Sequence, residues 1–476
     1  MVRGRALARL VTMTRPERAL KDSFALRWGM LVLQGAVVAV VYYFYDALAP
    51  LKGVMEQRLG FSSTDFGLIM SAAPFPNVFL GMAVIAGIMA DRLGIRLTGI
   101  LVMSVMLAGG LLTWYGCSSY FNSGGIGRDF LASFLPAYSP PLKAMAVGMF
   151  LFGFGIEAIF LVCSKAAVKW FSGGTLALAL GIQVSIARLG TAAAMFLPAR
   201  LVEPEWTLPV ALSAAFLGAG LLAFIAYAFV DKRFDEQQQA AAAAMGDKKD
   251  DGAFRISDVG RLLLNPSFLA IAALCVTFYS AVMPFMKFAP DLIANKYSVS
   301  PSTAGLIVAL LPFGTIVFTP MFAWVCDHKG RGATLMIVGS VLLGAVHLTF
   351  ALTSITPYVP IFVLGIAFSL IPAAMWPSLA KIVPQSRLGS AYGLIFTIQN
   401  IGLFAFPNLM GKVLDSTNPG VAAAKKAGQA AAYNYTPTTL MLAAVGLAAL
   451  GSALALKWAD RKQGYGLEKP NKMPKA

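Results

Sequence analysis

Long apolar stretches separated by short polar segments dominate the pattern of this chain. Each stretch is close to 20 residues, the length at which an α-helix crosses the ~30 Å hydrocarbon core of a bilayer. The pattern therefore predicts an all-α membrane protein with twelve spanning helices, six on each side of a polar break. The predicted limits are 28–46, 66–90, 97–115, 144–164, 174–198, 206–230, 266–287, 302–326, 334–353, 358–380, 388–411 and 437–457.

The polar break between the sixth and seventh spans predicts the domain organisation. Residues 231–265 are charged and Ala-rich and have few bulky apolar side chains with which to build a core. They predict a cytoplasmic linker between an N-terminal bundle at 28–230 and a C-terminal bundle at 266–458. Residues 1–27 and 459–476 are then cytoplasmic tails.

Composition and charge agree with a membrane protein and orient it. Only 13% of the residues are charged and 58% are hydrophobic. The net charge of +16 raises the question of nucleic-acid binding, but most of the 38 Lys and Arg residues fall in the two tails and in the loops on one side. This positive-inside pattern predicts that both termini are cytoplasmic, and it disfavours a nucleic-acid partner.

A short loop motif occurs twice, at the ends of the second and eighth spans, as GIMADRLGIR and AWVCDHKGRG. Its two acids are separated by nearly the same number of residues as the starts of the two halves, which indicates internal duplication. In each loop a glycine permits a tight turn and the acid can pair with a neighbouring helix. A plain solvated turn is the alternative. We expect the loops to hold helices together in one conformation and to release them in another through Gly87, Asp91, Arg92, Gly94, Arg96, Asp327, Gly330 and Arg331.

Three charged residues stand out within the apolar spans, where an unpaired charge costs at least about 2.5–3.5 kcal/mol. Asp46 is so near the outer end of the first span that we expect a solvated helix end. Glu157 and Arg188 lie deeper, in spans four and five, with an expected offset of about 10 Å along the membrane normal. A short zwitterion can bridge such an offset, its amine on Glu157 and its carboxylate on Arg188. A direct ion pair that locks the N-terminal half is the alternative.

The plan of the chain and its first loop motif resemble the major facilitator superfamily over essentially the whole length. The first loop has the family signature of Gly, three residues, Asp, Arg, one residue, Gly, one residue and Arg. In the second loop Ala323 and His328 replace the first Gly and the first basic residue. The resemblance implies a secondary transporter with its substrate site near the bilayer midplane, between two halves that rock to give alternating access.

Residues 153–190 resemble one branch of that superfamily, the lysosomal dipeptide transporters. They have a Gly-rich start, Glu157, and the pattern Gly-x-Gln-x-Ser-x-Ala-Arg-x-Gly that includes Arg188; further matches occur at 42–46, 278–285 and 387–403. The resemblance implies a dipeptide carrier in which Glu157 holds the substrate amine and Arg188 its carboxylate. The N-terminal tail has no acidic dileucine sorting signal, so we expect the cell (inner) membrane, with a lysosomal-type membrane as the alternative.

Four further residues are expected at the substrate site. Tyr279 lies in span seven, which Pro284 is expected to interrupt, and Trp376 lies between two prolines of span ten. Prolines bend helices where transporters need gates, so both aromatic residues are expected to line the cavity. An interface or packing role is the alternative. Gln399 and Asn400 are adjacent amides in an apolar run, expected to face the cavity or to bond another helix.

The mode of transport follows from the titratable groups near the site. Glu157 is the only carboxylate expected deep in a span; His328 belongs to a loop, and His347 in span nine is expected in packing or at the lipid interface. One carboxylate would have to bind both substrate and proton, so we expect facilitated diffusion rather than proton coupling. The cysteines are expected to be core residues; they are Cys117, Cys163, Cys275 and Cys326.

Other functional classes fit the sequence less well. An enzyme is excluded because no Cys/His or Ser/His constellation, phosphate loop or metal cluster occurs, and we expect neither a cofactor nor a metal. A non-transporting receptor or adaptor is disfavoured because the chain has no folded soluble appendage. A small organic anion carrier, with Arg188 as the anion ligand and Glu157 as a structural counter-ion, remains the main alternative. We expect a monomer, with dependence on an accessory subunit as the alternative.

Overall fold

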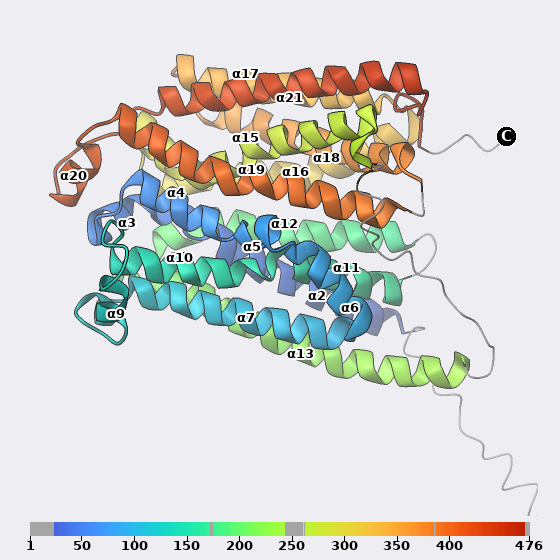
Figure 1. Ribbon diagram of the computed structural model, residues 1–476, viewed down its shortest axis with the longest axis horizontal. Helices are drawn as coiled ribbons and strands as arrows, with labels where there is room; N and C mark the ends of the chain where they lie inside the picture. Colours follow the sequence, from blue (N-terminus) through green and yellow to red (C-terminus); the bar gives the residue numbers. More distant parts are fainter. Residues whose placement is uncertain (1–22, 172–174, 243–259, 261, 385–386, 472–476) are drawn as a thin grey trace, which may run out of the picture.

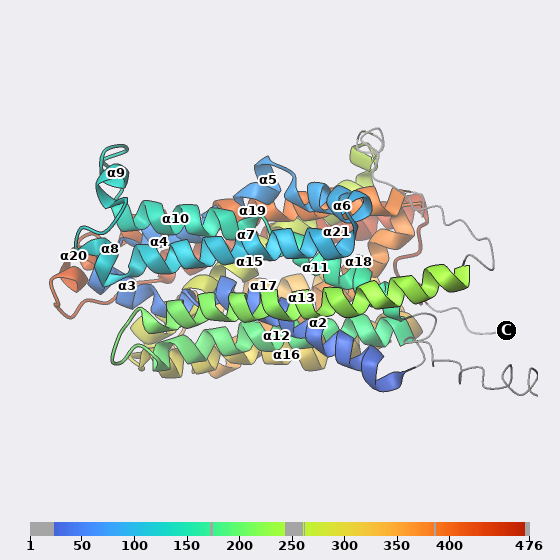
Figure 2. The ribbon, with the colours of Figure 1, turned by 90° about the horizontal axis from the view of Figure 1, so that it is seen from below.

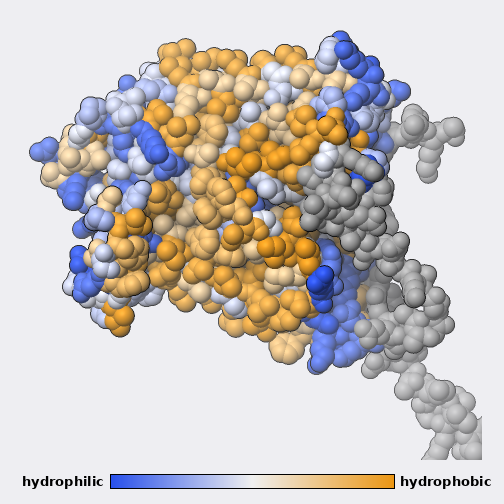
Figure 3. Space-filling model, in the orientation of Figure 1, coloured by the Kyte–Doolittle hydropathy of each residue, from blue (hydrophilic) through white to orange (hydrophobic). Residues whose placement is uncertain are grey.

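The structure, a computed structural model, is a bundle of long helices arranged in two halves. It describes residues 23–171, 175–242, 260, 262–384 and 387–471, within which every regular element is helical. Eleven of the described helices are long and apolar enough to cross a membrane. The N-terminal half lies beneath the C-terminal half in Figure 1, and a broad apolar belt separates two polar ends in Figure 3. The chain is therefore a multi-pass membrane protein.

The helices that form the spans follow the predicted order. The N-terminal half contains α2 (Phe24–Asp46), α4 (Ser63–Ala72), α5 (Phe75–Phe79), α6 (Met82–Arg92), α7 (Gly94–Cys117), α10 (Pro140–Gly153), α11 (Ile156–Trp170), α12 (Leu176–Arg200) and α13 (Leu208–Ala242). The C-terminal half contains α15 (Pro266–Tyr297), α16 (Pro301–His328), α17 (Gly332–Leu352), α18 (Tyr358–Ile382), α19 (Leu388–Thr417) and α21 (Thr436–Gln463). Short helices between them are η2 (Ala49–Leu51), α3 (Lys52–Leu59), α8 (Ser119–Asn122), α9 (Arg128–Ala132) and α20 (Val421–Lys426).

The two ends of the bundle differ in what they carry. Figures 1 and 2 show α3, α9 and α20 at one end, and Figure 1 shows the end of α21 at the other. We call these the α3/α20 end and the terminal end. The positive-inside pattern predicts that the terminal end is cytoplasmic.

The prediction of continuous helices is wrong for the second and fourth spans. The second is divided into α4, α5 and α6, which follow one another along the bundle (Figure 1), and the fourth is divided into α10 and α11. Close packing against neighbouring spans accompanies the break in span four. A Cβ on Gly153 would lie 1.9 Å from the carbonyl oxygen of Ala73, and one on Gly155 would lie 2.0 Å from Met106 Sδ. Only glycine fits at such distances, so the break in span four is built around these residues.

The helices of spans six and seven are longer than predicted. Helix α13 continues to Ala242, into the segment predicted as a linker. Helix α15 passes through Pro284 and Pro290 without interruption and ends at Tyr297, so the expectation that Pro284 breaks span seven is wrong. A proline removes a single main-chain donor, and the surrounding helices of a buried bundle can hold the helix together at that point.

Small residues let the two halves approach each other closely. Helix α12 packs on α16, and α4 packs on α19. A Cβ on Gly305 would lie 2.1 Å from the carbonyl oxygen of Met195, and one on Gly67 would lie 2.3 Å from that of Pro407. In a bilayer, where apolar side chains gain little by leaving lipid, such close backbone packing is a main source of helix association.

Candidate functional site

Glu157 lies in the first turn of α11, directly after the break in span four. Helix N-termini favour negative side chains because unsatisfied N–H groups and the helix dipole point toward them. The buried amide of Asn400 on α19 donates from Nδ2 to Glu157 Oε1 at 3.3 Å. Because α11 belongs to the N-terminal half and α19 to the C-terminal half, the carboxylate lies where the two halves meet.

Arg188 lies on α12 between aromatic rings from both halves. Its Cζ atom is 5.0 Å from the ring centroid of Phe368 on α18 and 5.9 Å from that of Tyr42 on α2. A guanidinium over a ring face is attracted by the π electrons, and its N–H groups remain available at its edge. Tyr42 and Phe368 were missed in the sequence because aromatic residues are ordinary in apolar spans.

Glu157 and Arg188 do not neutralise each other. Within the described residues, no carboxylate oxygen lies within 4.0 Å of the Arg188 guanidinium. The direct ion pair considered from the sequence is therefore absent. Each charge has a neighbour from the C-terminal half, since Asn400 of α19 bonds Glu157 and Phe368 of α18 lies against Arg188. The arrangement presents one cationic and one anionic group to the region between the halves.

Tyr279 and Trp376 lie in aromatic clusters of the C-terminal half. The buried ring of Tyr279 packs edge-on against Phe368, with centroids 5.9 Å apart. The alternative that Tyr279 lies at the membrane–water interface is therefore wrong. Trp376 packs on Tyr392 and Phe396 of α19 at 5.7 and 5.1 Å. Phe368 thus contacts both Tyr279 and Arg188, whereas the rings that contact Trp376 belong to α19.

Gln399, which precedes Asn400 in the chain, lies in a different environment. Its Oε1 accepts a hydrogen bond from Cys275 Sγ at 3.6 Å, between α19 and α15. The four cysteines are buried and unpaired, as predicted. His347 is fully buried against the ring of Phe285 at 5.0 Å, so it has the packing role and the lipid-interface alternative is wrong.

The prediction that Asp46 is a solvated helix end is wrong. Asp46 is buried and forms an ion pair with Lys287 of α15. Lys287 also donates to the carbonyl oxygen of Tyr45 at 2.7 Å and lies 3.4 Å from the centroid of that ring. The cause is the greater length of α15, which places Lys287 inside the bundle. Since Asp46 is one turn from Tyr42, this pair connects the halves next to the candidate site.

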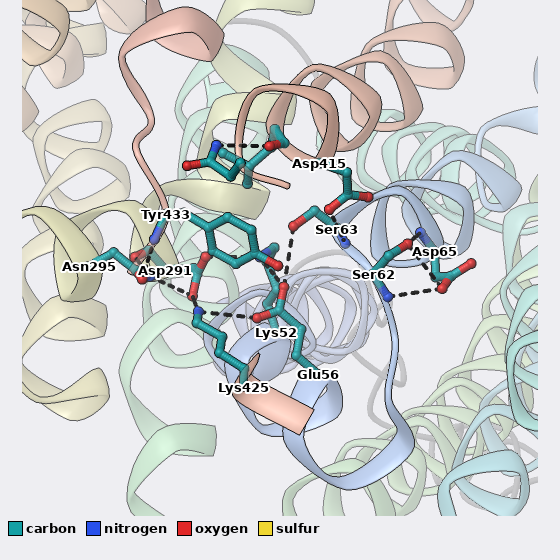
Figure 4. A network of polar contacts seen from close by, with 12 residues as sticks. Lys52, Glu56, Ser62, Ser63, Asp65, Asp291, Asn295, Asp415, Lys425 and Tyr433 are labelled. Atoms are coloured by element: carbon teal, nitrogen blue, oxygen red, sulfur yellow. Dashed lines mark hydrogen bonds and ion pairs between the residues drawn. The ribbon is translucent and has the colours of Figure 1, made fainter. Parts of the chain in front are cut away.

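A cluster of four charged residues joins the halves at the α3/α20 end (Figure 4). Lys52 Nζ lies 2.5 Å from Glu56 Oε1 and 2.9 Å from Asp291 Oδ2. Lys425 Nζ lies 3.2 Å from Glu56 Oε2 and 3.8 Å from Asp291 Oδ1. The side chains of Lys52 and Glu56 are 0% exposed. We call these four residues the charge cluster; its two buried carboxylates, Glu56 and Asp291, lie outside the predicted spans.

Two tyrosines complete the charge cluster. The ring centroid of Tyr433 is 4.5 Å from Lys52 Nζ, and the hydroxyl of Tyr435 donates to Asp291. Burial raises the pKa of both hydroxyls above the ordinary value, so both stay protonated, and the Tyr435 hydroxyl is a donor to Asp291. The cluster is thus satisfied by charges and hydrogen bonds from three separate parts of the chain.

Asp415 of α19 caps helix α4 across the interface between the halves. Its carboxylate accepts hydrogen bonds from the main-chain N–H groups of Ser63 at 3.1 Å and Thr64 at 2.7 Å, and from the Thr64 hydroxyl at 2.6 Å. A charged acceptor at a helix N-terminus is favourable. Together with the charge cluster, this cap closes the α3/α20 end.

The first loop motif joins helices of its own half. Asp91 forms an ion pair with Lys165 of α11, and Gly94 has a φ of 80° at the turn into α7. Gly87 faces the side chain of Leu161 on α11, while Arg92 is exposed in the last turn of α6. The tight turn and the pairing acid are as expected from the residue types; the release of these contacts during transport stays a prediction.

Arg96, the last residue of that motif, reaches α13. Its Nη1 lies 3.2 Å from Asp235 Oδ2, and Lys169 of α11 lies 2.8 Å from Asp231. Asp231 is fully buried and also accepts a hydrogen bond from Tyr227 at 2.9 Å. These contacts hold α7, α11 and α13 together at the terminal end.

The second loop motif is built differently. Asp327 accepts a hydrogen bond from Asn471 at 3.1 Å, and Gly330 and Arg331 both have left-handed φ values, of 73° and 63°. His328 bonds the main chain of its own helix. In this half the segment that follows α21 is in contact with the motif.

Comparisons with known proteins agree with this architecture. The family model described as Major Facilitator Superfamily matches residues 34–407 and 285–467. The lysosomal dipeptide transporters MFSD1 of Mus musculus and Homo sapiens are each 28% identical over 387 residues, which cover 79% of this chain and 77% of theirs.

Solved structures share the fold at low identity. The nucleoside transporter NupG has a TM-score of 0.64 at 13% identity, with 90% of this chain and 99% of that chain covered. The D-xylose–proton symporter has a TM-score of 0.62 at 12% identity, with 93% and 98% covered. A bacterial homologue of the human lysosomal transporter Spinster, inward-facing and occupied, has a TM-score of 0.59 at 14% identity, with 96% and 100% covered.

Proposed function

The chain belongs to the major facilitator superfamily of membrane transporters, and from this premise we propose that it carries dipeptides or similar small zwitterions by alternating access. The observation that carries the proposal is the pair Glu157 and Arg188. One anionic and one cationic group lie at the interface of the halves, each beside a residue of the C-terminal half, and without an ion pair between them. A zwitterion satisfies both at once, its ammonium group on Glu157 and its carboxylate on Arg188.

Both charges, which belong to the N-terminal half, are in contact with residues of the C-terminal half. Asn400 donates to Glu157, and Phe368 lies against Arg188. A ligand held between Glu157 and Arg188 therefore also borders the other half, and its binding can favour the closed arrangement of the two halves. The relatives named lysosomal dipeptide transporters support this substrate class.

The relatives' name bears on location as well. It supports a lysosomal-type membrane as the alternative. We keep the cell membrane as the proposed location.

Binding of chemically blocked peptides tests the substrate assignment. We expect a free dipeptide such as Ala-Ala to raise the melting temperature of the purified protein, because a ligand that binds only the folded state stabilises it. N-acetylation removes the ammonium group and C-terminal amidation removes the carboxylate, so each blocked peptide is expected to give no shift. An equal shift with the acetylated peptide or with succinate would instead favour a carrier of small organic anions.

We further propose that transport is facilitative. Asp46, Glu56 and Asp291 each have a lysine partner, whereas Glu157 has the amide of Asn400 and is the carboxylate open to an ammonium group. If Glu157 binds substrate, it cannot carry a proton in the same step. Uptake into proteoliposomes is therefore expected without proton movement, as read by an entrapped pH dye. A proton entering with each dipeptide contradicts this.

A further inference from the structure

Residues 464–471 fold back onto the C-terminal half after α21 ends. Gly464 and Gly466 have left-handed φ values of 75° and 74°, which turn the chain at the helix end. The sequence predicts only a cytoplasmic tail here. We call residues 464–471 the tail segment.

The main chain of the tail segment bonds to the loop between α16 and α17. The N–H of Arg331 donates to the carbonyl oxygen of Glu468 at 2.9 Å, and that of Gly332 donates to the carbonyl oxygen of Leu467 at 3.0 Å. Arg331 has a φ of 63°, a conformation that costs a non-glycine residue energy and persists where the surroundings enforce it. A Cβ on Gly330 would lie 2.4 Å from the Glu468 carbonyl oxygen. The loop is therefore shaped to the tail segment.

Side chains of the tail segment occupy defined places. The carboxylate of Glu468 accepts from the Thr334 N–H at 2.9 Å in the first turn of α17 and lies 3.4 Å from Lys457 Nζ. Leu467 is 1% exposed, and its N–H donates to Asp460 at 3.1 Å. A carboxylate at a helix N-terminus and a buried leucine are features of a bound ligand, in contrast to a solvated tail.

Contacts at both ends of the tail segment extend this attachment. Lys381 of α18 donates to the carbonyl oxygen of Lys469 at 2.7 Å. Asn471 donates to Asp327 at the end of α16, and Asn265, which caps α15, donates to the Tyr465 hydroxyl at 2.9 Å. The tail segment thus touches the terminal ends of α15, α16, α17, α18 and α21.

The N-terminal half holds the same end with its own helices. There, Asp91 pairs with Lys165, and Asp231 and Asp235 bind Lys169 and Arg96. In the C-terminal half the tail segment contacts the second copy of the motif, through the Asn471 side chain on Asp327 and the main-chain bonds to Arg331 and Gly332.

We propose that the loop between α16 and α17, with the adjacent ends of α18 and α21, is a peptide-binding site whose ligand is the tail segment of the same chain. The bound tail segment holds the C-terminal half together at its terminal end. Alternating access by rocking needs each half to move as one body, so its release loosens the moving unit.

Removal and return of the tail segment test this proposal. A chain that ends at residue 463 is compared with a control chain that ends at residue 471 and keeps the tail segment. We expect the shorter chain to melt at least about 5 °C below the control, since several hydrogen bonds and a buried leucine are lost. A synthetic peptide of residues 464–471 is expected to restore at least half of the difference, and the same peptide with Glu468→Ala to restore none.

A substitution in the full chain covers the case in which the shorter chain does not fold. Glu468→Ala is expected to lower the melting temperature, whereas Lys469→Ala keeps the carbonyl group that Lys381 binds and is expected to leave it unchanged. Equal melting temperatures of both chain lengths, or of Glu468→Ala and wild type, overturn the proposal. So does a shorter chain that melts early but is not stabilised by millimolar peptide. None of these readouts requires a transported substrate, so they stand apart from the dipeptide proposal.

Discussion

Replacing Arg188 by lysine is expected to lower uptake of a free dipeptide by about 10- to 100-fold at low substrate concentration. Arginine holds a carboxylate through two parallel hydrogen bonds, and lysine offers a point charge. Hydrogen bonds to charged groups contribute roughly 1.5–3 kcal/mol, and 1.4 kcal/mol is a factor of ten. The cation–π contacts with Phe368 and Tyr42 also lose the planar group that matches a ring.

Glu157→Gln is the complementary variant for the same measurement. It keeps the size of the side chain and removes the charge that the substrate ammonium group needs, so dipeptide uptake is expected to fall by a similar factor. Arg461→Lys, an exposed position at the end of α21, is the matched control and is expected to be neutral. Full uptake by Glu157→Gln together with loss in Arg188→Lys contradicts the amine-binding role and points to an anion carrier.

The helices could be predicted because bilayer thickness sets their length, but the breaks in spans two and four could not. A hydropathy pattern reports how apolar a segment is, and the broken segments are as apolar as the continuous ones. The break at Gly153 and Gly155 depends on Ala73 and Met106, which come from helices distant in sequence. Such packing appears only when the helices are assembled.

The sequence reveals those residues of the candidate site that are of an unusual type for their surroundings. A carboxylate and a guanidinium in apolar runs stand out, so Glu157 and Arg188 could be named from the sequence. Lys52 and Asp291 were not, because they occur between predicted spans, where charge is ordinary. Their burial results from the folding of α3, α15 and α20 against one another, which joins residues far apart in the chain. The tail segment was missed for the same reason.

Lys52→Met is expected to open the α3/α20 end. In the closed structure Lys52 is fully buried and neutralises Glu56 and Asp291, which would otherwise share Lys425. Breaking a buried ion pair by removing one partner costs about 3–5 kcal/mol, because the remaining charge is left without compensation. When this end opens, water can solvate the carboxylates, so the cost falls mainly on the closed state. The open state should therefore gain at least about 100-fold in relative population.

The distance between two spin labels measures this opening. The labels are placed on exposed residues of the two halves, Arg58 on α3 and Gln429 beyond α20. Wild type is expected to give the short distance of the closed end, and Lys52→Met a second, longer one. Lys426→Met, an exposed neighbour of the charge cluster, is the control for loss of a lysine. Lys52→Met combined with Asp291→Asn removes both members of one pair, which is often nearly neutral, and should restore the short distance. An unchanged distance in Lys52→Met would mean that the glycine contacts and the Asp415 cap keep this end closed without the charge cluster.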